Sequence, residues 1–394
     1  MQTWWQRDWV KISIVFVIWQ IVVWSISWLT VRLDWPVFAP SYSRSELISE
    51  STLPQAVSRL TGFDGVHYQT IVTQGYDAAW GLVAFFPLYP LLIWCLTLLG
   101  AKPMLAGLLV SSGCWYGFLL LVFQLAKSKY GRRTAWWFVW TMVWQPVSFF
   151  AGAYYTESLF LLLLTCCLVA YERKKYGWCG WWALLMSATR VVGVLIVPAL
   201  IVDYLWQKRK NWGCRKDWLP VIQLSVGLLG LLAYMGYLTW SFDDPVAFMT
   251  VQDDFGSGRQ TSQLVLLPQV FFRYGKMLWY GLQPTWKSFA IVQELVITLF
   301  YLFIVVVTAW QNNRCKKFVY PLSWWLFSVG ILVVPTLTGH LSSMPRYLLP
   351  CLVVNLYLAR LGVKRPYLVS ILLSVSALLM ALNLMLFVQG YWVA

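Results

Sequence analysis

Charged residues are scarce in this sequence. They make up 11% of its 394 residues, whereas hydrophobic residues make up 60%. A water-soluble domain of this size needs a polar shell, and so little charge cannot provide one. The composition excludes a soluble enzyme and predicts an all-α integral membrane protein that crosses the bilayer several times.

Metal-binding and disulfide patterns are also missing. The two histidines, His67 and His340, are far apart, and the eight cysteines follow no metal or disulfide spacing. No Asp-x-Asp pair occurs near Asp64. We expect no metal and no cofactor. One acidic cluster, which we interpret as a solvated loop, could hold a divalent cation only if it folded back on itself: Asp243, Asp244, Asp253 and Asp254.

Long runs without charge predict the membrane spans. A helix needs roughly 20 apolar residues to cross about 30 Å of hydrocarbon. The longer runs are 10–31, 103–126, 134–156, 218–242, 295–313, 318–345 and 366–394, and shorter ones are 158–171, 176–189, 191–202 and 347–359. The first run is too long for a signal peptide and lacks a cleavage pattern, so we interpret it as a retained span. About eleven spans are predicted, in one domain over residues 1–394.

The distribution of Lys and Arg predicts the topology. If segment 84–100 stays at the outer interface, twenty of the thirty basic residues lie on the inner side, as short cytoplasmic loops require. If that segment crosses the bilayer, most basic residues lie on the outer side instead, which the rule disfavours. The preferred arrangement has two long extracytoplasmic loops, 33–103 and 241–287, with interfacial helices. The net charge of +15 then suits anionic membrane lipid and gives no evidence for nucleic-acid binding.

One carboxylate stands out in the first outer loop. The segment FDGVHY (63–68) places Asp64 at the expected start of an amphipathic helix between apolar segments. His67 and Tyr68 follow three and four residues later, so the three side chains share a helix face. A general base for glycosyl transfer would suit this place. Asp is also a good N-cap residue, and capping alone is the alternative.

Three further polar residues lie at the outer ends of apolar segments. Glu157, in YYTESLF, begins a run of uncharged residues, where the helix dipole alone could favour it. Arg190 interrupts an apolar stretch, which is costly unless the guanidinium snorkels or meets an anion. Arg346, in MPRY, is either a second phosphate contact or an interfacial anchor.

The order of these segments resembles the PIG-V family of polytopic mannosyltransferases. The resemblance rests on the segments FDGVHY, FFPLYPLL, YYTESLF, ATRVVGVL and MPRY, which together cover most of the chain. It departs from the family at Val192, where family members carry Asn, so a role for that amide is not carried over. The resemblance implies a glycosyltransferase C fold and a polyprenyl-phosphate sugar as donor. The implied reaction is an inverting transfer of a hexose, expected to be mannose, to a lipid-linked or glycan acceptor outside the membrane.

The same resemblance implies roles for individual residues. Asp64 and Glu157 would be catalytic, and the substrate-binding residues would be His67, Tyr68, Arg190 and Arg346. The compact chain suits a bacterial plasma membrane, or the endoplasmic reticulum membrane if the source is eukaryotic. Two alternatives remain. A transporter or flippase of lipid-linked saccharides would carry ionisable residues near the bilayer midplane, and a noncatalytic assembly partner would tolerate loss of the Asp64 carboxylate.

Overall fold

The computed structural model describes residues 4–33, 48, 51–76, 81–209, 217–252, 265–281, 283, 285–314 and 318–393. Every regular element in these ranges is helical, which confirms the all-α prediction. The chain forms two compact units, and the helices α8 (Glu157–Glu172) and α18 (Leu352–Lys364) each contribute residues to both. The assignment of a single domain to residues 1–394 stays a prediction.

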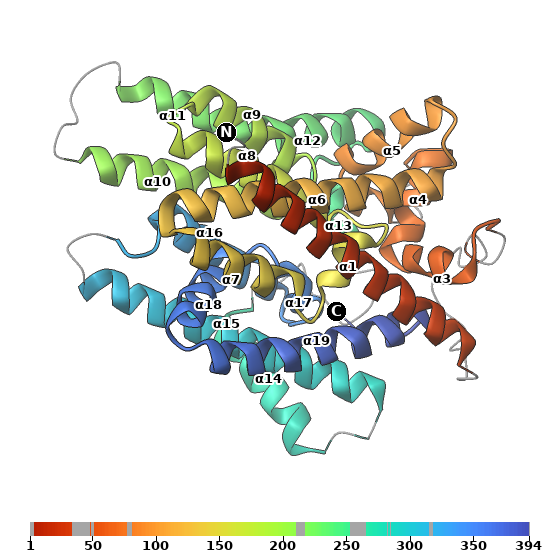
Figure 1. The fold of residues 1–394 in the computed structure, drawn as a ribbon. Coiled ribbons are helices and arrows are strands. Elements are labelled where there is room, and N and C mark those ends of the chain that lie inside the picture. Colours follow the sequence, from red (N-terminus) through yellow and green to blue (C-terminus); the bar gives the residue numbers. More distant parts are fainter. Residues whose placement is uncertain are drawn as a thin grey trace. The chain divides into compact units, whose positions relative to one another are not determined.

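The first unit comprises Met1–Gly75, Tyr89–Leu162 and Leu358–Val393. Its long helix α1 packs along α6 and α19 (Figure 1). Besides its parts of α8 and α18, its helices are α1 (Trp4–Arg32), α3 (Gln55–Ser58), η1 (Arg59–Thr61), α4 (Asp64–Gln74), α5 (Leu88–Leu98), α6 (Pro103–Tyr130), α7 (Arg132–Val143), η4 (Ser148–Gly152) and α19 (Pro366–Val388).

The second unit comprises Tyr76–Leu88 and Leu163–Tyr357. In it, α9 packs against α11 and α12, and α10 packs against α16 (Figure 1). Its further helices are η3 (Leu82–Ala84), α9 (Tyr176–Ser187), η5 (Val191–Leu195), α10 (Ile196–Lys208), α11 (Trp218–Ser225), η7 (Val226–Leu228), α12 (Leu229–Phe242), α13 (Ala247–Thr250), α14 (Leu267–Trp279), α15 (Trp286–Arg314), α16 (Leu322–Val333), η9 (Pro335–Thr338) and α17 (Met344–Tyr347).

The protein is an integral membrane protein. Within the described ranges, six helical segments are long and apolar enough to cross a bilayer: Asp8–Arg32, Pro103–Tyr130, Val191–Lys208, Trp218–Phe242, Trp286–Arg314 and Pro366–Val388. The count of about eleven spans stays a prediction. The described helix α5, at 11 residues, is only about 16 Å long, which is too short to cross on its own.

The run 134–156, predicted as one span, is a broken helix instead. Helix α7 ends at Val143, because Pro146 cannot continue it. The carbonyls that the break releases accept hydrogen bonds from polar side chains of α19: Ser376 donates to Trp144 O, and Asn383 Nδ2 donates to Pro146 O at 2.9 Å. Irregular backbone is tolerated at membrane depth when protein buries it, and here the break leads directly into the segment that carries Glu157.

Ion pairs join the start of α1 to the end of α6 and to the first residue of α7. The Asp8 carboxylate accepts a bond from Lys127 Nζ at 2.7 Å and from Arg132 Nε at 2.8 Å. If α1, α5 and α6 each crossed the bilayer, these residues would lie on opposite sides of it. The ion pairs therefore agree with the topology in which segment 84–100 does not cross.

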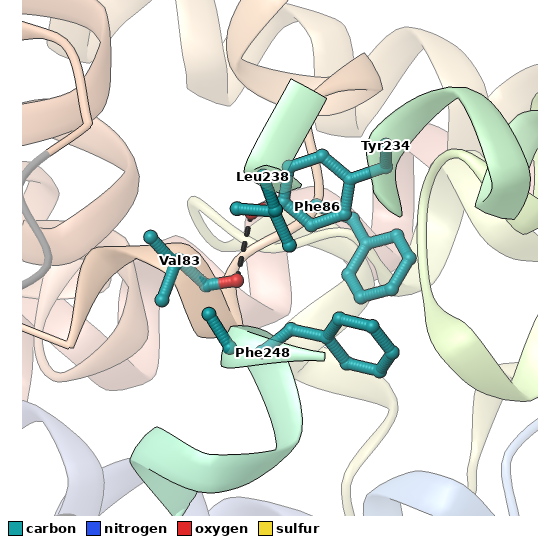
Figure 2. Packing of buried hydrophobic residues seen from close by; sticks show 6 residues of the cluster. Val83, Phe86, Tyr234, Leu238 and Phe248 are labelled. Atoms are coloured by element: carbon teal, nitrogen blue, oxygen red, sulfur yellow. Dashed lines mark hydrogen bonds between the residues drawn. The ribbon is translucent and has the colours of Figure 1, made fainter. Parts of the chain in front are cut away.

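A buried apolar cluster of the second unit holds residues 83–86 of the first long loop in place. Figure 2 shows Val83, Phe86, Tyr234, Leu238 and Phe248 packed together, with the Tyr234 hydroxyl donating to Val83 O at 2.7 Å. These residues come from η3 and the chain after it, from α12 and from α13. Because Val83 and Phe86 are buried in this cluster, the start of FFPLYPLL and the residues before it are held against α12.

Candidate active site

Asp64 is the first residue of α4, so the predicted helix start is confirmed. Phe63 occupies the N-cap position. The N–H groups of Gly65 and Val66 donate to the carbonyls of Gly62 and Phe63, at 3.2 and 3.0 Å. The alternative in which Asp64 is the N-cap is therefore wrong, because Phe63 holds that position.

Phe63 has an unusual backbone conformation that sets the direction of the turn before Asp64. Its φ is 55° and its ψ is −115°. A bulky residue rarely adopts a positive φ, and such strain costs about 1–3 kcal/mol. The Phe63 ring packs against Phe387 and Trp392, with ring centroids 5.4 and 5.0 Å away. This packing holds the strained turn, and it gives a structural reason for an aromatic residue directly before the aspartate.

The Asp64 turn is bound to the segment that carries Glu157. Tyr154 N–H donates to Leu60 O at 3.1 Å, and the Tyr155 hydroxyl donates to Gly62 O at 2.9 Å. Glu157 follows as the first residue of α8 and is 2% exposed. The sequence treats FDGVHY and YYTESLF as separate candidates, and the structure brings the two segments together within one unit.

Tyr68 belongs to a buried aromatic stack. Its ring lies edge-on to Tyr89 at 5.1 Å, and Tyr89 lies edge-on to Tyr154 at 5.8 Å. Tyr68 is 6% exposed, whereas His67, one residue earlier on α4, is half-buried. The stack gives Tyr68 a packing role beside Asp64. Substrate contacts of His67 and Tyr68 stay predictions.

Sequence reasoning missed the residues that support this stack. The Tyr89 hydroxyl donates to Gly107 O at 3.1 Å and shares a hydrogen bond with Ser111 Oγ at 2.8 Å. Ser111 in turn donates to Tyr155 O at 3.1 Å. The sequence does contain a pattern that could have identified them. Gly107 and Ser111 are small residues four apart on one face of a helix, which is typical of close helix packing in membranes.

Replacing Gly107 by Ala is expected to destabilise the site. An added Cβ would lie 2.1 Å from the ring of Tyr154, so the stack must shift. Overpacking of this kind costs about 1–3 kcal/mol. Thermal unfolding of the detergent-purified protein should show a lower midpoint for Gly107→Ala. Gly113→Ala on the same helix is the control, since a Cβ there meets nothing within 4 Å. Equal midpoints for the two variants would contradict the described packing.

The two candidate arginines lie in the second unit and share one neighbour. Arg190 has extended backbone before η5, and its guanidinium carbon lies 5.1 Å from the ring centroid of Tyr347. Tyr347 directly follows Arg346 in α17, and Arg346 is 5% exposed. An interfacial anchor would be exposed, so burial argues against that alternative for Arg346. Arg190 is half-buried and lies over an aromatic ring, so snorkelling and a phosphate contact both stay open for it.

A buried polar network holds the loop before Arg346. The Glu294 carboxylate, 5% exposed, accepts bonds from the Tyr274 hydroxyl at 2.9 Å and from Ser343 N–H at 3.3 Å. The same hydroxyl accepts a bond from Leu341 N–H at 3.1 Å. Burial, and next the Glu294 carboxylate, raise the pKa of the Tyr274 phenol, so it remains a donor. Glu294 and Tyr274 thus fix the chain that leads into α17.

Tyr274→Phe tests this network. Losing the hydroxyl leaves a buried carboxylate oxygen and a buried backbone N–H without that partner, at a cost of about 1–3 kcal/mol for each group. The variant should unfold at a clearly lower temperature than the wild type. The matched control is Tyr280→Phe, six residues further on, where the side chain is 79% exposed and a near-neutral effect is expected. A neutral Tyr274→Phe would show that the network does not hold the loop.

The described part of the chain contains no group of three or more His, Cys, Asp or Glu side chains that could hold a metal ion. In the acidic cluster, Asp244 Oδ1 accepts a bond from Val246 N–H at 2.9 Å, and its Oδ2 accepts one from Thr250 Oγ1 at 3.3 Å. This carboxylate therefore caps a local turn. Asp253 and Asp254 lie outside the described residues, so cation binding by the full cluster is not tested.

No protein-family model matches the sequence, and the search of curated proteins finds no match. Among solved structures, the chain is similar to the apo oligosaccharyltransferase of Archaeoglobus fulgidus, with a TM-score of 0.51 and 13% identity over 100% of this chain and 57% of that chain. It is also similar to ArnT from Cupriavidus metallidurans bound to undecaprenyl phosphate, with a TM-score of 0.49 and 12% identity over 97% and 76% of the two chains. The likeness to the oligosaccharyltransferase shows a shared fold.

Proposed function

We propose that this protein is a membrane glycosyltransferase that moves a hexose, mannose in the first instance, from a polyprenyl-phosphate donor to a lipid-linked or glycan acceptor on the extracytoplasmic side. The observation that carries the proposal is the pairing of the Asp64 turn with the Glu157 segment. A fold shared with an oligosaccharyltransferase supports it. Membership of the PIG-V family, and with it the choice of mannose, rests on the sequence resemblance.

In the proposed reaction, the Asp64 carboxylate takes the proton from the acceptor hydroxyl. The acceptor oxygen then forms a bond to the anomeric carbon as the bond from that carbon to the phosphate oxygen breaks. The polyprenyl phosphate leaves with the electron pair, and the anomeric centre is inverted. A positioned base contributes about 100- to 10,000-fold to such a step. Asp64 is half-buried at the first turn of α4, which fits a base that a substrate can reach.

The other candidate residues have supporting roles in this proposal. Arg190 and Arg346 would stabilise the charge that develops on the leaving phosphate, because a guanidinium offers a two-pronged donor to phosphate oxygens. Glu157 is the second carboxylate of the reaction, and His67 and Tyr68 would contact substrate from the same helix as Asp64. No metal or other cofactor is required in this scheme.

A donor panel tests the proposal. The purified protein in proteoliposomes is given polyprenyl-phosphate mannose, glucose or galactose together with a membrane glycolipid extract, and the product is analysed by NMR for its anomeric configuration. We expect the fastest transfer from the mannose donor and an inverted product. Faster transfer of another hexose would show that mannose is not the preferred donor sugar. A retained anomeric configuration would overturn the single-step mechanism.

A further inference from the structure

A cavity of the first unit is lined by none of the proposed catalytic residues. A cavity of about 350 Å³ lies between the first turns of α1 and the last turns of α6, within the first unit. It is lined by Asp8, Trp9, Ile12, Leu120, Phe123, Gln124, Lys127 and Ser128. Ile12 and Phe123 are buried, so the inner wall is apolar, while Trp9 and Ser128 at its edge are exposed.

The charged residues that line this cavity are Asp8 and Lys127, and Arg132, which does not line it, adds a second cation beside Asp8. Asp8 is a single buried carboxylate, and it is paired with two cations, Lys127 and Arg132. The two basic side chains are 36% and 41% exposed, so both also reach the surface. A Lys ammonium carries three N–H donors, and Asp8 accepts from Lys127 through one 2.7 Å contact. Lys127 therefore keeps donor capacity for an anion at the mouth of the cavity.

Other basic residues extend the positive surface around this edge. Lys11 on α1, Lys129 on α6 and Arg133 on α7 are all exposed. By the distribution of basic residues this end of the helices faces the cytoplasm, where the membrane surface is negatively charged. An apolar wall with a cationic edge at this depth matches one class of molecule, a lipid with apolar chains and an anionic headgroup.

We propose that this cavity binds an anionic phospholipid. An acyl segment would lie against Ile12, Leu120 and Phe123, and the headgroup phosphate would accept bonds from Lys127 at the edge. A lipid held there would contact α1 and α6 together and so reinforce the junction that Asp8 makes between them. None of the proposed catalytic residues lines the cavity, so the lipid site and the proposed function can be tested independently.

Native mass spectrometry of the full-length protein in a neutral detergent tests the site. The probes are phosphatidylglycerol and phosphatidylcholine with the same acyl chains. We expect phosphatidylglycerol to bind at least about fivefold more tightly, the contribution typical of one basic residue at an anionic membrane surface. Lys127→Gln should remove most of that preference, while Arg132 still pairs with Asp8.

Two further variants separate the cavity from general surface charge. Lys129→Gln is the matched control, because it removes the same charge from the same helix end at a position that does not line the cavity. It should leave the preference unchanged. Gln124→Trp keeps every charge but fills the cavity, and it should weaken phosphatidylglycerol binding without lowering the unfolding temperature.

Three results would overturn the proposal. Equal binding of the two lipids would show that the headgroup charge is not recognised. Equal losses in Lys127→Gln and Lys129→Gln would show an effect of surface charge alone. Complete displacement of phosphatidylglycerol by millimolar inorganic phosphate, with Gln124→Trp unchanged, would show a site for a free anion rather than for a lipid.

Discussion

Asp64→Asn is expected to lower the rate of sugar transfer by about 100- to 10,000-fold while leaving the yield of folded protein close to that of the wild type. The amide has the size of the carboxylate but cannot accept the acceptor proton. In free energy, the expected loss of transition-state stabilisation is about 2.7–5.5 kcal/mol. Initial rates with a labelled donor in proteoliposomes, normalised to folded protein, measure the effect.

The expected effect of Asp64→Asn on the free energy of unfolding is much smaller than its expected effect on catalysis. Asp64 lies in the first turn of α4, where the helix dipole stabilises a carboxylate by about 0.3–1 kcal/mol, and the Asn amide loses that interaction. Asp243→Asn is a suitable control. Asp243 ends α12 with φ 56°, a conformation that Asn adopts readily. Transfer by Asp64→Asn at the rate of Asp243→Asn would remove Asp64 as the base.

Arg190→Ala is the second large effect that we expect. If the guanidinium stabilises the leaving phosphate, its loss should lower the turnover rate by about 100-fold or more and weaken use of the donor more than use of the acceptor. The stacking of Arg190 on Tyr347 is worth only about 0.5–2 kcal/mol, so loss of packing alone predicts a smaller change. Steady-state kinetics with donor and acceptor varied separately measure the turnover rate and the KM for each substrate.

Two variants sharpen this test. Arg190→Lys keeps the positive charge but loses the planar two-pronged geometry, so its rate should lie between those of the wild type and Arg190→Ala. Tyr347→Leu removes the stacking partner and leaves the guanidinium in place, and it should retain more activity than Arg190→Ala. A rise in the acceptor KM alone, with donor use unchanged, would show that Arg190 does not serve the phosphate.

The fold could be predicted from the sequence to the extent that local composition decides it. Apolar runs without charge specify membrane helices, and the start of α4 at Asp64 follows from a change in local pattern. The run 134–156 was predicted incorrectly, because it is uncharged and mostly apolar, and Pro146 is the residue that marks the break. The partners that make the break tolerable, Ser376 and Asn383, lie more than two hundred residues away. No local pattern contains that information.

The candidate site, like the fold, could be predicted from the sequence only in part. Residue type and spacing identify Asp64, Glu157 and Arg190 as candidates, since a charged side chain stands out in an apolar sequence. The contacts that position them are long-range: Tyr155 binds the Asp64 turn through Gly62. The strained φ of Phe63 could not be predicted either, because an isolated chain disfavours it and tertiary packing against Phe387 maintains it.

The most direct test of the central claim is a doubly labelled donor. Polyprenyl-phosphate mannose carries one label in the sugar and another in the phosphate, and the purified protein is supplied with this donor and a glycolipid acceptor in proteoliposomes. We expect the sugar label to move to the acceptor while the phosphate label stays with the polyprenyl lipid. If both labels cross the bilayer together on an intact donor and no labelled acceptor forms, the protein is a transporter and not a glycosyltransferase.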